Sequence, residues 1–123
     1  VIAPHVYPKL NYDPLKDLVP AGAFAVSPMV LVVPADSPAK SVRDLVAMAK
    51  AKPGELSFAS SGSGALPHLT TEQFMQAAGV KMTHVPYKGS GPALPDLVAG
   101  RTQMMIDVIV SAMPLVEGGK LRA

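Results

Sequence analysis

Short blocks of apolar residues alternate with amphipathic stretches along the chain, and this pattern predicts strands and helices in turn. Strands are predicted over residues 21–35, 56–60, 82–86 and 103–107, and from Leu121 onward. Helices are predicted between Ser41 and Pro53, and over residues 65–78, 92–99 and 111–117. The first strand, AGAFAVSPMVLVVPA, is either one long buried strand or two halves broken at Pro28, because proline cannot donate to a ladder.

The predicted helices carry capping residues at their ends. Ser41 can cap the first of the long helices, and Asp44 three residues later makes a variant of the capping box. Pro53 and Gly54 stop that helix, while Gly79 closes the next one. These signals separate each predicted strand from the following one by a helix.

The strict alternation of strand and helix, with short corners, indicates an α/β fold. Such connections cross over right-handedly, so the sheet is expected to be mostly parallel and covered by helices on both faces. Strands that are apolar on both sides agree with this arrangement. Residues 1–20 are rich in Pro and Tyr without any period and are predicted to form an irregular lead-in arm, followed by the α/β lobe at 21–123.

Composition is that of one ordinary globular domain. With 49% hydrophobic and 16% charged residues, the 123-residue chain can build a core and carries too little charge for disorder. The net charge is +2 without a run of Lys or Arg, which argues against nucleic acid and suits a small anionic ligand. The absence of Cys excludes disulfides and Cys-type zinc sites, and no metal or cofactor is predicted. The apolar stretch 21–35 is too short and too interrupted to span a bilayer.

Two stretches of the chain are near copies of one another: SSGSGALPHL at residues 60–69 and KGSGPALPDL at residues 88–97. Each follows a predicted strand and opens a predicted helix, so both corners are expected at the carboxyl edge of the sheet. Small residues allow close approach to a ligand, and helix N-termini attract anions. Ser60, Ser61 and Ser63 add hydroxyl groups for a carboxylate or phosphate. The alternative is that Gly and Ser only make tight turns.

Other polar residues at the same edge are weaker candidates. Tyr87 and Lys88 could contact an anion, although a packed Tyr and a solvated Lys explain them equally simply. Asp107 could orient a water, accept from a ligand amine or cap the following helix. His68 is interpreted as a packing or hydrogen-bonding residue. A triad of Ser61 or Ser63 with His68 and Asp107 can be imagined, but no G-x-S-x-G motif supports a hydrolase.

Four segments together give the chain a specific resemblance to a known family. It resembles the Bug (TctC) family, the periplasmic solute-binding proteins of tripartite tricarboxylate transporters. The resemblance implies one lobe of a type II periplasmic-binding-protein fold, with residues 1–20 as the tail of a first lobe. It also implies a periplasmic location and membrane permease subunits as partners. The segments are NYDPLKDLVPAG, SPMVLVVPADSPAKSVRDLVAMAKAKPGELSFASSGSG, HVPYKGSGPALPDLVAGRTQMMID and SAMPLVEGGKLRA.

The resemblance also implies a ligand class and a set of ligand-binding positions. Ligands would be small organic anions: di- or tricarboxylates, acidic amino acids or aromatic acids. Ala65 and Pro67 stand where family members often carry hydroxyl residues, so backbone groups would donate more of the hydrogen bonds to the ligand carboxylate. The implied ligand-binding residues are Ser60, Ser61, Gly62, Ser63, Gly64, Ala65, Tyr87, Lys88, Gly89, Ser90 and Asp107.

Two further expectations concern the whole protein. Besides a non-catalytic solute-binding lobe, the alternatives are an effector-sensing regulatory lobe and a serine-dependent hydrolase. Both ends of the sequence look cut, so a C-terminally truncated fragment is expected, with exposed strand edges around residues 26–33 and at Leu121. Exposed edges favour pairing with a second copy, so a dimer or strand-swapped form is predicted.

Overall fold

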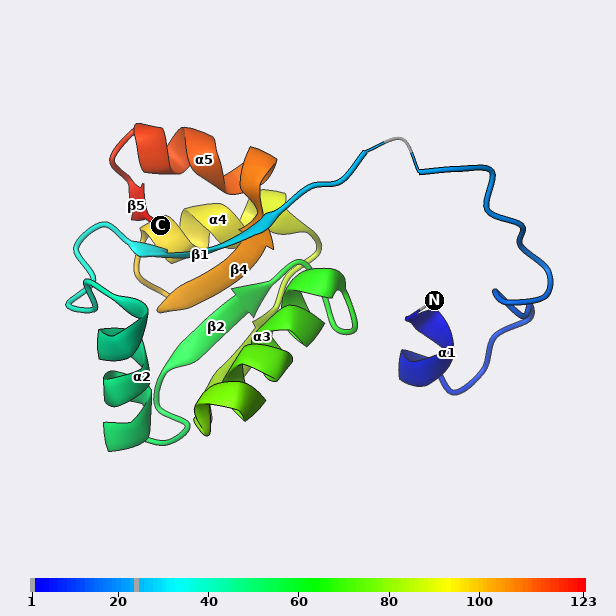
Figure 1. The fold of residues 1–123 in the computed structure, drawn as a ribbon. Helices are drawn as coiled ribbons and strands as arrows, with labels where there is room; N and C mark the ends of the chain where they lie inside the picture. Colours follow the sequence, from blue (N-terminus) through cyan, green and yellow to red (C-terminus); the bar gives the residue numbers. More distant parts are fainter. Residues whose placement is uncertain (1, 24) are drawn as a thin grey trace.

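The computed structural model describes residues 2–23 and 25–123 and places five strands in one sheet (Figure 1). The strands are β1 (Met29–Pro34), β2 (Ser57–Ser60), β3 (Thr83–Pro86), β4 (Met104–Val108) and β5 (Leu121–Arg122). The helices are α1 (Ala3–Val6), α2 (Val42–Ala51), α3 (Leu66–Ala78), α4 (Ser90–Val98) and α5 (Ile109–Glu117). From β1 onward strands and helices alternate, as the sequence pattern predicts.

The strand order across the sheet is β3-β2-β4-β1-β5. β2 pairs in parallel with both β3 and β4, whereas β1 is antiparallel to both β4 and β5. Four strands therefore run in one direction and only β1 runs against them, which confirms the mostly parallel α/β fold. The reversed direction of β1 is a feature that the sequence pattern did not indicate, because a Val-rich buried strand reads the same in either orientation.

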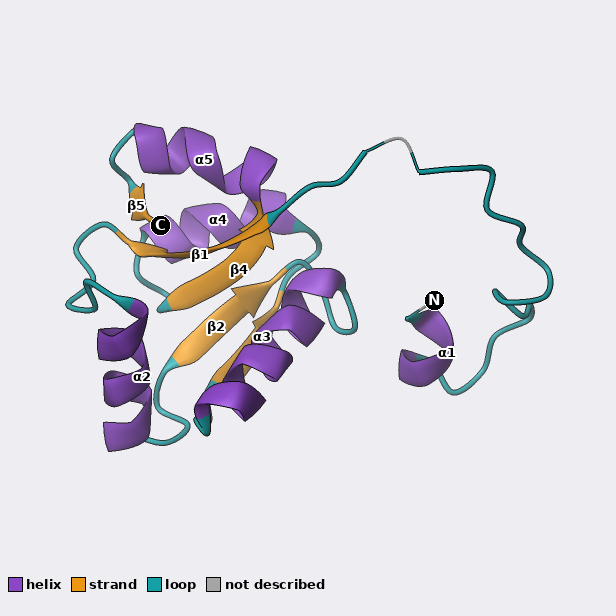
Figure 2. Ribbon diagram, viewed as in Figure 1, coloured by secondary structure: helices purple, strands orange, loops and turns teal. Residues whose placement is uncertain are grey.

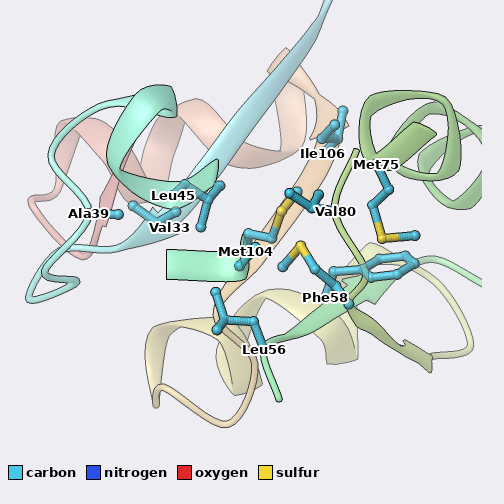
Figure 3. Close-up of a cluster of buried hydrophobic side chains, with 11 residues drawn as sticks. Val33, Ala39, Leu45, Leu56, Phe58, Met75, Val80, Met104 and Ile106 are labelled. Carbon is cyan, nitrogen blue, oxygen red and sulfur yellow. The ribbon is translucent and has the colours of Figure 1, made fainter. Parts of the chain in front are cut away.

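Helices cover both faces of the sheet, as predicted (Figure 2). Neighbouring side chains of a strand point to opposite faces. Met104 and Ile106 of β4 join the cluster beneath α2 and α3, whereas Met105 between them joins the cluster beneath α4 and α5. The first cluster, drawn in Figure 3, contains Val33, Ala39, Leu45, Ala49, Leu56, Phe58, Met75, Val80, Met82, Met104 and Ile106. The second contains Val32, Ala59, Ala93, Leu94, Leu97, Met105, Ala112 and Leu121.

The helix ends follow the capping residues in the sequence. Ser41 Oγ accepts a hydrogen bond from Asp44 N at 3.1 Å, and Gly79 closes α3 with a left-handed φ of 64°. The last two helices begin earlier than expected, at Ser90 instead of Pro92 and at Ile109 instead of Ser111. For α4, Pro92 in the first turn is compatible with the earlier start, since the N–H groups there have no intrahelical partner. In the described part of the chain, no helix has the length and apolar character needed to cross a bilayer.

Neither alternative for residues 21–35 is met in full: the strand occupies only the part after Pro28, and the described residues before it form no strand. β1 starts at Met29, and Val26 before it is 93% exposed. The carbonyl of Pro28 still accepts a hydrogen bond from Ile109 N at 3.0 Å, which aligns the start of β1 with the start of α5. β5 pairs with β1 only at its last two residues. Among the described residues, the outer edge of positions 29–32 therefore faces no strand.

Arg122 fixes the connection between β1 and α2. Its guanidinium donates to the carbonyls of Ala35, Ser37 and Ala39 at 2.5, 3.1 and 3.0 Å. The planar fork of an Arg side chain can serve several acceptors in one geometry. This single side chain therefore joins β5 to a loop that lies far from it in sequence.

The arm contains the short helix α1 and a turn around Asp13, and Figure 1 shows it extending away from the sheet. Val6 of α1 lies against Gly64 of the lobe. A β-carbon built at Gly64 would overlap Cγ1 of Val6 and would lie 3.2 Å from Val6 Cβ. The arm thus packs on the first of the two repeated loops.

Candidate ligand-binding site

The two repeated loops, which we call the first loop (residues 60–65) and the second loop (residues 87–90), lie side by side. β2 and β3 are parallel neighbours, so both loops leave the same edge of the sheet. Tyr87 N donates to Ser60 O at 3.0 Å, and Gly89 N donates to Ser61 O at 3.1 Å. Gly62 faces the second loop, since a β-carbon there would lie 3.5 Å from Tyr87 O. The structure therefore brings the repeated stretches together as one surface.

Three helix N-termini lie at this edge. The helices α3, α4 and α5 start directly after the parallel strands β2, β3 and β4, and Figure 2 shows all three starts on the side of the strand arrowheads. The first turn of a helix has N–H groups without intrahelical partners and carries a partial positive charge. At α4 these groups belong to Ser90 and Gly91, because Pro92 has no N–H. The edge as a whole favours an anion.

The first loop uses part of its backbone internally. Gly64 N donates to His68 Nδ1 at 3.0 Å, and Ala65 N donates to Gly62 O at 3.2 Å. The N–H groups of Gly64 and Ala65 are thus engaged by other groups of the chain. Ser63 is exposed and its N–H has no protein partner among the described residues. Ser63 is the group that this loop offers most directly to a ligand.

Ser60 also serves the loop instead of facing outward. It is fully buried, and its Oγ lies 2.6 Å from His84 Nε2 and 3.2 Å from both Gly62 N and Gly62 O. Its hydroxyl therefore fixes the turn at the end of β2. The expectation of a hydroxyl group available to a ligand at this position is not met, because the side chain points to the α3 face of the sheet beside Phe58.

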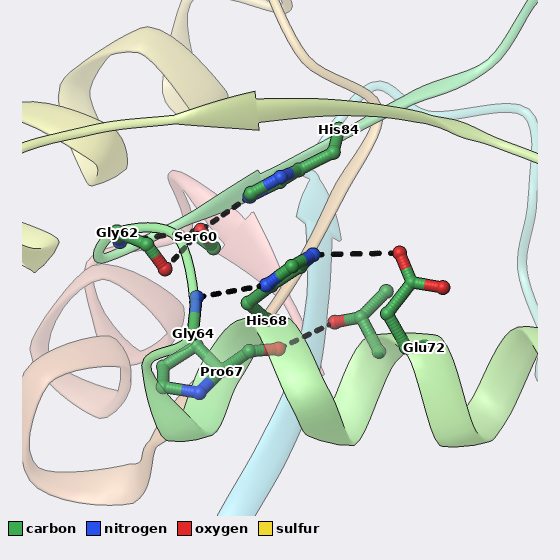
Figure 4. Close-up of polar contacts among 8 residues, drawn as sticks. Ser60, Gly62, Gly64, Pro67, His68, Glu72 and His84 are labelled. Carbon is green, nitrogen blue, oxygen red and sulfur yellow. Dashed lines mark hydrogen bonds and ion pairs between the residues drawn. The ribbon is translucent and has the colours of Figure 1, made fainter. Parts of the chain in front are cut away.

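Beneath the first loop, His68 and His84 stack on one another (Figure 4). Their ring centroids are 3.9 Å apart and the rings are 7° from parallel. His68 Nε2 lies 3.4 Å from Glu72 Oε1, while Phe58 stacks on His84 at 4.9 Å. Burial, and then the repulsion that a protonated His68 would exert, lower the pKa of His84 below its ordinary value of 6.5, against a smaller raising effect of Glu72.

The His pair was not anticipated as a unit. His68 acts as a hydrogen-bonding residue, as the sequence indicated, but its relation to His84 depends on strand register. β2 and β3 pair so that Phe58 is opposite His84, and α3 returns His68 over that pair. The signal available beforehand was the parallel pairing of LSFAS with MTHVP, which puts these residues on one face.

In the second loop, the phenol of Tyr87 is directed to helix α4. Tyr87 OH donates to Asp96 Oδ2 at 2.9 Å, and Arg101 binds the other oxygen of Asp96 at 2.7 Å. Burial, followed by the Asp96 hydrogen bond, raises the pKa of Tyr87 above its ordinary value. Tyr87 therefore anchors the second loop, whereas Lys88 is exposed and free to meet solvent.

Asp107 lies at the carboxyl end of β4 and is 1% exposed. Its Oδ1 accepts from Val108 N at 2.9 Å, so it bonds its neighbour and does not cap the residues of α5. Its Oδ2 has no partner among the described residues. Buried carboxylate oxygens are normally paired. Asp107 consequently retains an acceptor at the edge where the helices begin.

The structure does not assemble the hypothetical Ser-His-Asp triad. Both ring nitrogens of His68 are in use, one facing Gly64 N and the other facing Glu72. Asp107 alternates with Ile106 and so lies on the opposite face of β4 from the α3 side, where His68 stacks. A serine at residues 61–63 therefore has no base oriented by Asp107.

Comparison with known proteins finds relatives that cover nearly the whole of this chain. A protein of Pseudomonas sp. (strain P51), "UPF0065 protein in tcbD-tcbE intergenic region", is 44% identical over 95% of this chain and 35% of its own length. Protein BugT of Bordetella pertussis is 38% identical over 94% of this chain and 36% of its own length. The chain thus spans about a third of the length of these relatives.

Solved structures also match nearly the whole chain. The "Structure of a periplasmic transporter" superposes with a TM-score of 0.91 and 41% identity over 99% of this chain and 41% of that one. An R. palustris protein with adipate superposes with a TM-score of 0.89 and 42% identity, over 95% of this chain and 39% of that one. MatC from Rhodopseudomonas palustris, with bound malate, superposes with a TM-score of 0.89 and 31% identity, over 99% of this chain and 42% of that one.

The fold and the paired loops define one lobe of a periplasmic binding protein. The sequence model of the TctC family, described as "Tripartite tricarboxylate transporter family receptor", matches residues 1–123. The chain belongs to this family, which confirms the resemblance drawn from its motifs.

Proposed function

We propose that this chain is a non-catalytic lobe that holds the carboxylate of a small organic anion for a tripartite tricarboxylate transporter. The observation that carries the proposal is the pair of loops that two backbone hydrogen bonds join at the N-termini of α3 and α4. Donors for the anion are the N–H and hydroxyl of Ser63, the hydroxyl of Ser61 and the first turn of α4 from Ser90. These groups lie at the N-terminal, positive ends of two neighbouring helices.

The ligand class follows from the same groups and from the relatives. Two solved relatives, with 42% and 31% identity, contain adipate and malate. Di- or tricarboxylates, acidic amino acids and aromatic acids all present a carboxylate to such loops. The unpartnered Oδ2 of Asp107 favours a ligand that also brings a hydroxyl or ammonium donor, or a bridging water.

The cellular setting belongs to the same proposal. As a receptor lobe, the chain would work in the periplasm and deliver its ligand to membrane permease subunits. Residues 1–20 would be the lead-in from a first lobe, and the contact of Val6 with Gly64 supports their position next to the site. Closure of a first lobe onto the paired loops would complete the enclosure of the ligand.

Titration of the protein with adipate and malate, followed by amide NMR shifts, tests the binding proposal. We expect shifts at residues 61–65 and 89–91, and none with 1,6-hexanediol, which keeps the adipate chain without its carboxylates. Ser63→Leu is expected to weaken binding about tenfold or more, equivalent to about 1.4 kcal/mol, because it blocks the loop. Ser27→Leu, a matched change in an exposed segment, leaves binding unchanged. Equal shifts with the diol, or none with any acid, would contradict the proposal.

The free edge of β1 leads to a proposal about the isolated chain. Positions 29–32 present unpaired backbone groups on the side that β5 does not cover. Since open strand edges pair with other strands, we expect self-association, as a dimer or strand-swapped form, at high protein concentration. Light scattering across a concentration series is the measurement. A monomer mass at every concentration contradicts this proposal and leaves the carboxylate site unaffected.

A further inference from the structure

The stacked histidines beneath the first loop each make a hydrogen bond to it. His68 contacts the loop through Gly64, and His84 contacts it through Ser60 (Figure 4). These two attachment points lie at either end of the turn that presents Ser61 and Ser63. The pair is therefore the internal support of the loop on the side away from the ligand.

The hydrogen bonds determine which proton His68 carries. A backbone N–H can only donate, so the Gly64 N–H requires a bare Nδ1 on His68. The ring is then neutral with its proton on Nε2, where Glu72 Oε1 lies 3.4 Å away as the acceptor. A second proton would have to sit on Nδ1, facing the Gly64 N–H at 3.0 Å. Protonation of His68 is thus incompatible with this conformation of the loop.

His84 behaves differently at its own contact. The 2.6 Å contact between Ser60 Oγ and His84 Nε2 can run in either direction, because a hydroxyl both donates and accepts. A charged His84 would donate to Ser60, whose hydroxyl could then turn to Gly62 O at 3.2 Å. However, two positive rings at a centroid distance of 3.9 Å repel one another, so charge on one ring opposes charge on the other.

The surroundings of the pair contain few charges. The titratable groups that face His84 are His68 and Glu72, and Phe58 from β2 supplies an apolar wall at 4.9 Å. Burial is the largest cause of the lowered pKa of His84, so the neutral form is favoured at neutral pH. Because its pKa is lowered in the folded state, His84 contributes its full stability above about pH 6.5, the ordinary pKa of His. That contribution is lost as pH falls through the pKa of His84 in the folded protein.

We propose that His68 and His84 are positioning residues of the carboxylate site: the neutral stack holds the first loop in place, and protonation of His68 releases it. This inference rests on the proposed binding function. Protonation first breaks the hydrogen bond between Gly64 N and His68 Nδ1. The first loop then loses its fixed position beside the second loop, and its donors no longer face the ligand together. Because preorganisation contributes to affinity, carboxylate binding weakens as pH falls through the histidine titration. The fall is at most about tenfold per pH unit below the midpoint.

Two measurements on the same protein test the inference. The first follows the Gly64 amide and the imidazole resonances by NMR between about pH 7.5 and pH 5.5, the range of histidine titration. We expect the Gly64 amide resonance to shift as pH falls through this range, with or without ligand. The second measures malate affinity over the same range, in which its carboxylates stay largely ionised. The first measurement separates the inference from the binding proposal, because it needs no ligand.

Matched variants distinguish positioning from simple packing. His68→Asn keeps an acceptor near Nδ1 but cannot be protonated, so it should bind malate at pH 7.5 and lose the pH dependence. His68→Leu has no acceptor and should bind weakly at every pH while retaining a dispersed NMR spectrum. His5→Gln removes the remaining histidine of the chain and should leave the pH profile intact. Any of three results would overturn the inference. The Gly64 amide resonance could stay constant with pH, the malate affinity could stay level or rise as pH falls, or the pH dependence of binding could persist in His68→Asn.

Discussion

Replacing Phe58 by alanine is expected to destabilise the fold by about 3–5 kcal/mol, the usual loss for removing a fully buried aromatic side chain. Phe58 is 0% exposed and lies on the interior strand β2, between β3 and β4, in the cluster covered by α2 and α3. The sheet around it cannot collapse into the space, because strands on both sides hold β2 by backbone pairing. The substitution would also remove the apolar wall against which His84 stacks.

Urea unfolding followed by circular dichroism measures this loss. Tyr12→Ala is the matched control, because it truncates an aromatic side chain that is 45% exposed on the arm and should change stability by less than about 0.5 kcal/mol. Phe58→Leu should lie between the two, since it keeps part of the buried volume. A loss below about 1 kcal/mol for Phe58→Ala would mean that the core is not packed around this ring.

The second large effect is expected at Gly64, where alanine should impair both stability and ligand binding. Gly64 has φ +76°, a conformation that costs about 1–2 kcal/mol for a residue with a β-carbon. The added atom would also overlap Val6 of the arm. Relief of both strains moves the Gly64 N–H away from His68, so the first loop would lose its place beside the second loop and adipate binding would fall about tenfold or more.

Gly54→Ala is the control that isolates the overlap. Gly54 has a similar φ of +81° but nothing within 4 Å of a built β-carbon, and it lies away from the site. It should cost only the backbone strain and leave adipate binding unchanged. Adding Val6→Ala to Gly64→Ala should restore the part of the lost stability that the overlap causes, as measured by urea unfolding. Equal losses for the two glycine variants would contradict the contact between the arm and the loop.

The site shows a division of labour among residues that look equivalent in sequence. The two loops share the motif G-S-G, yet their polar side chains have different tasks. Ser60 and Tyr87 bond inward, to His84 and Asp96, and so fix the two loops. Ser63 and Lys88 are exposed and available. A substitution of an inward residue should therefore act through loop geometry, whereas one of an outward residue should act on the ligand directly.

Local residue chemistry determined most of the secondary structure of this protein. Ser41 with Asp44, and Gly79 in its left-handed conformation, place helix ends where the sequence predicted them. The apolar strands predicted helices on both faces, and two buried clusters confirm this. The alternation of strand and helix placed both loops at one sheet edge, because parallel strands end together.

Only the tertiary structure decided the direction of β1 and the tasks of individual polar groups. A buried strand has the same pattern in either direction, so its antiparallel pairing with β4 depends on long-range contacts. The stack of His68 on His84 arises from strand register and the return of α3, and Asp107 keeps an unpaired oxygen because of where β4 ends. The sequence by itself determined the elements, the order in which they follow one another and the loops. Which donor meets which acceptor was decided in space, since hydrogen bonds between distant residues leave no local pattern along the chain.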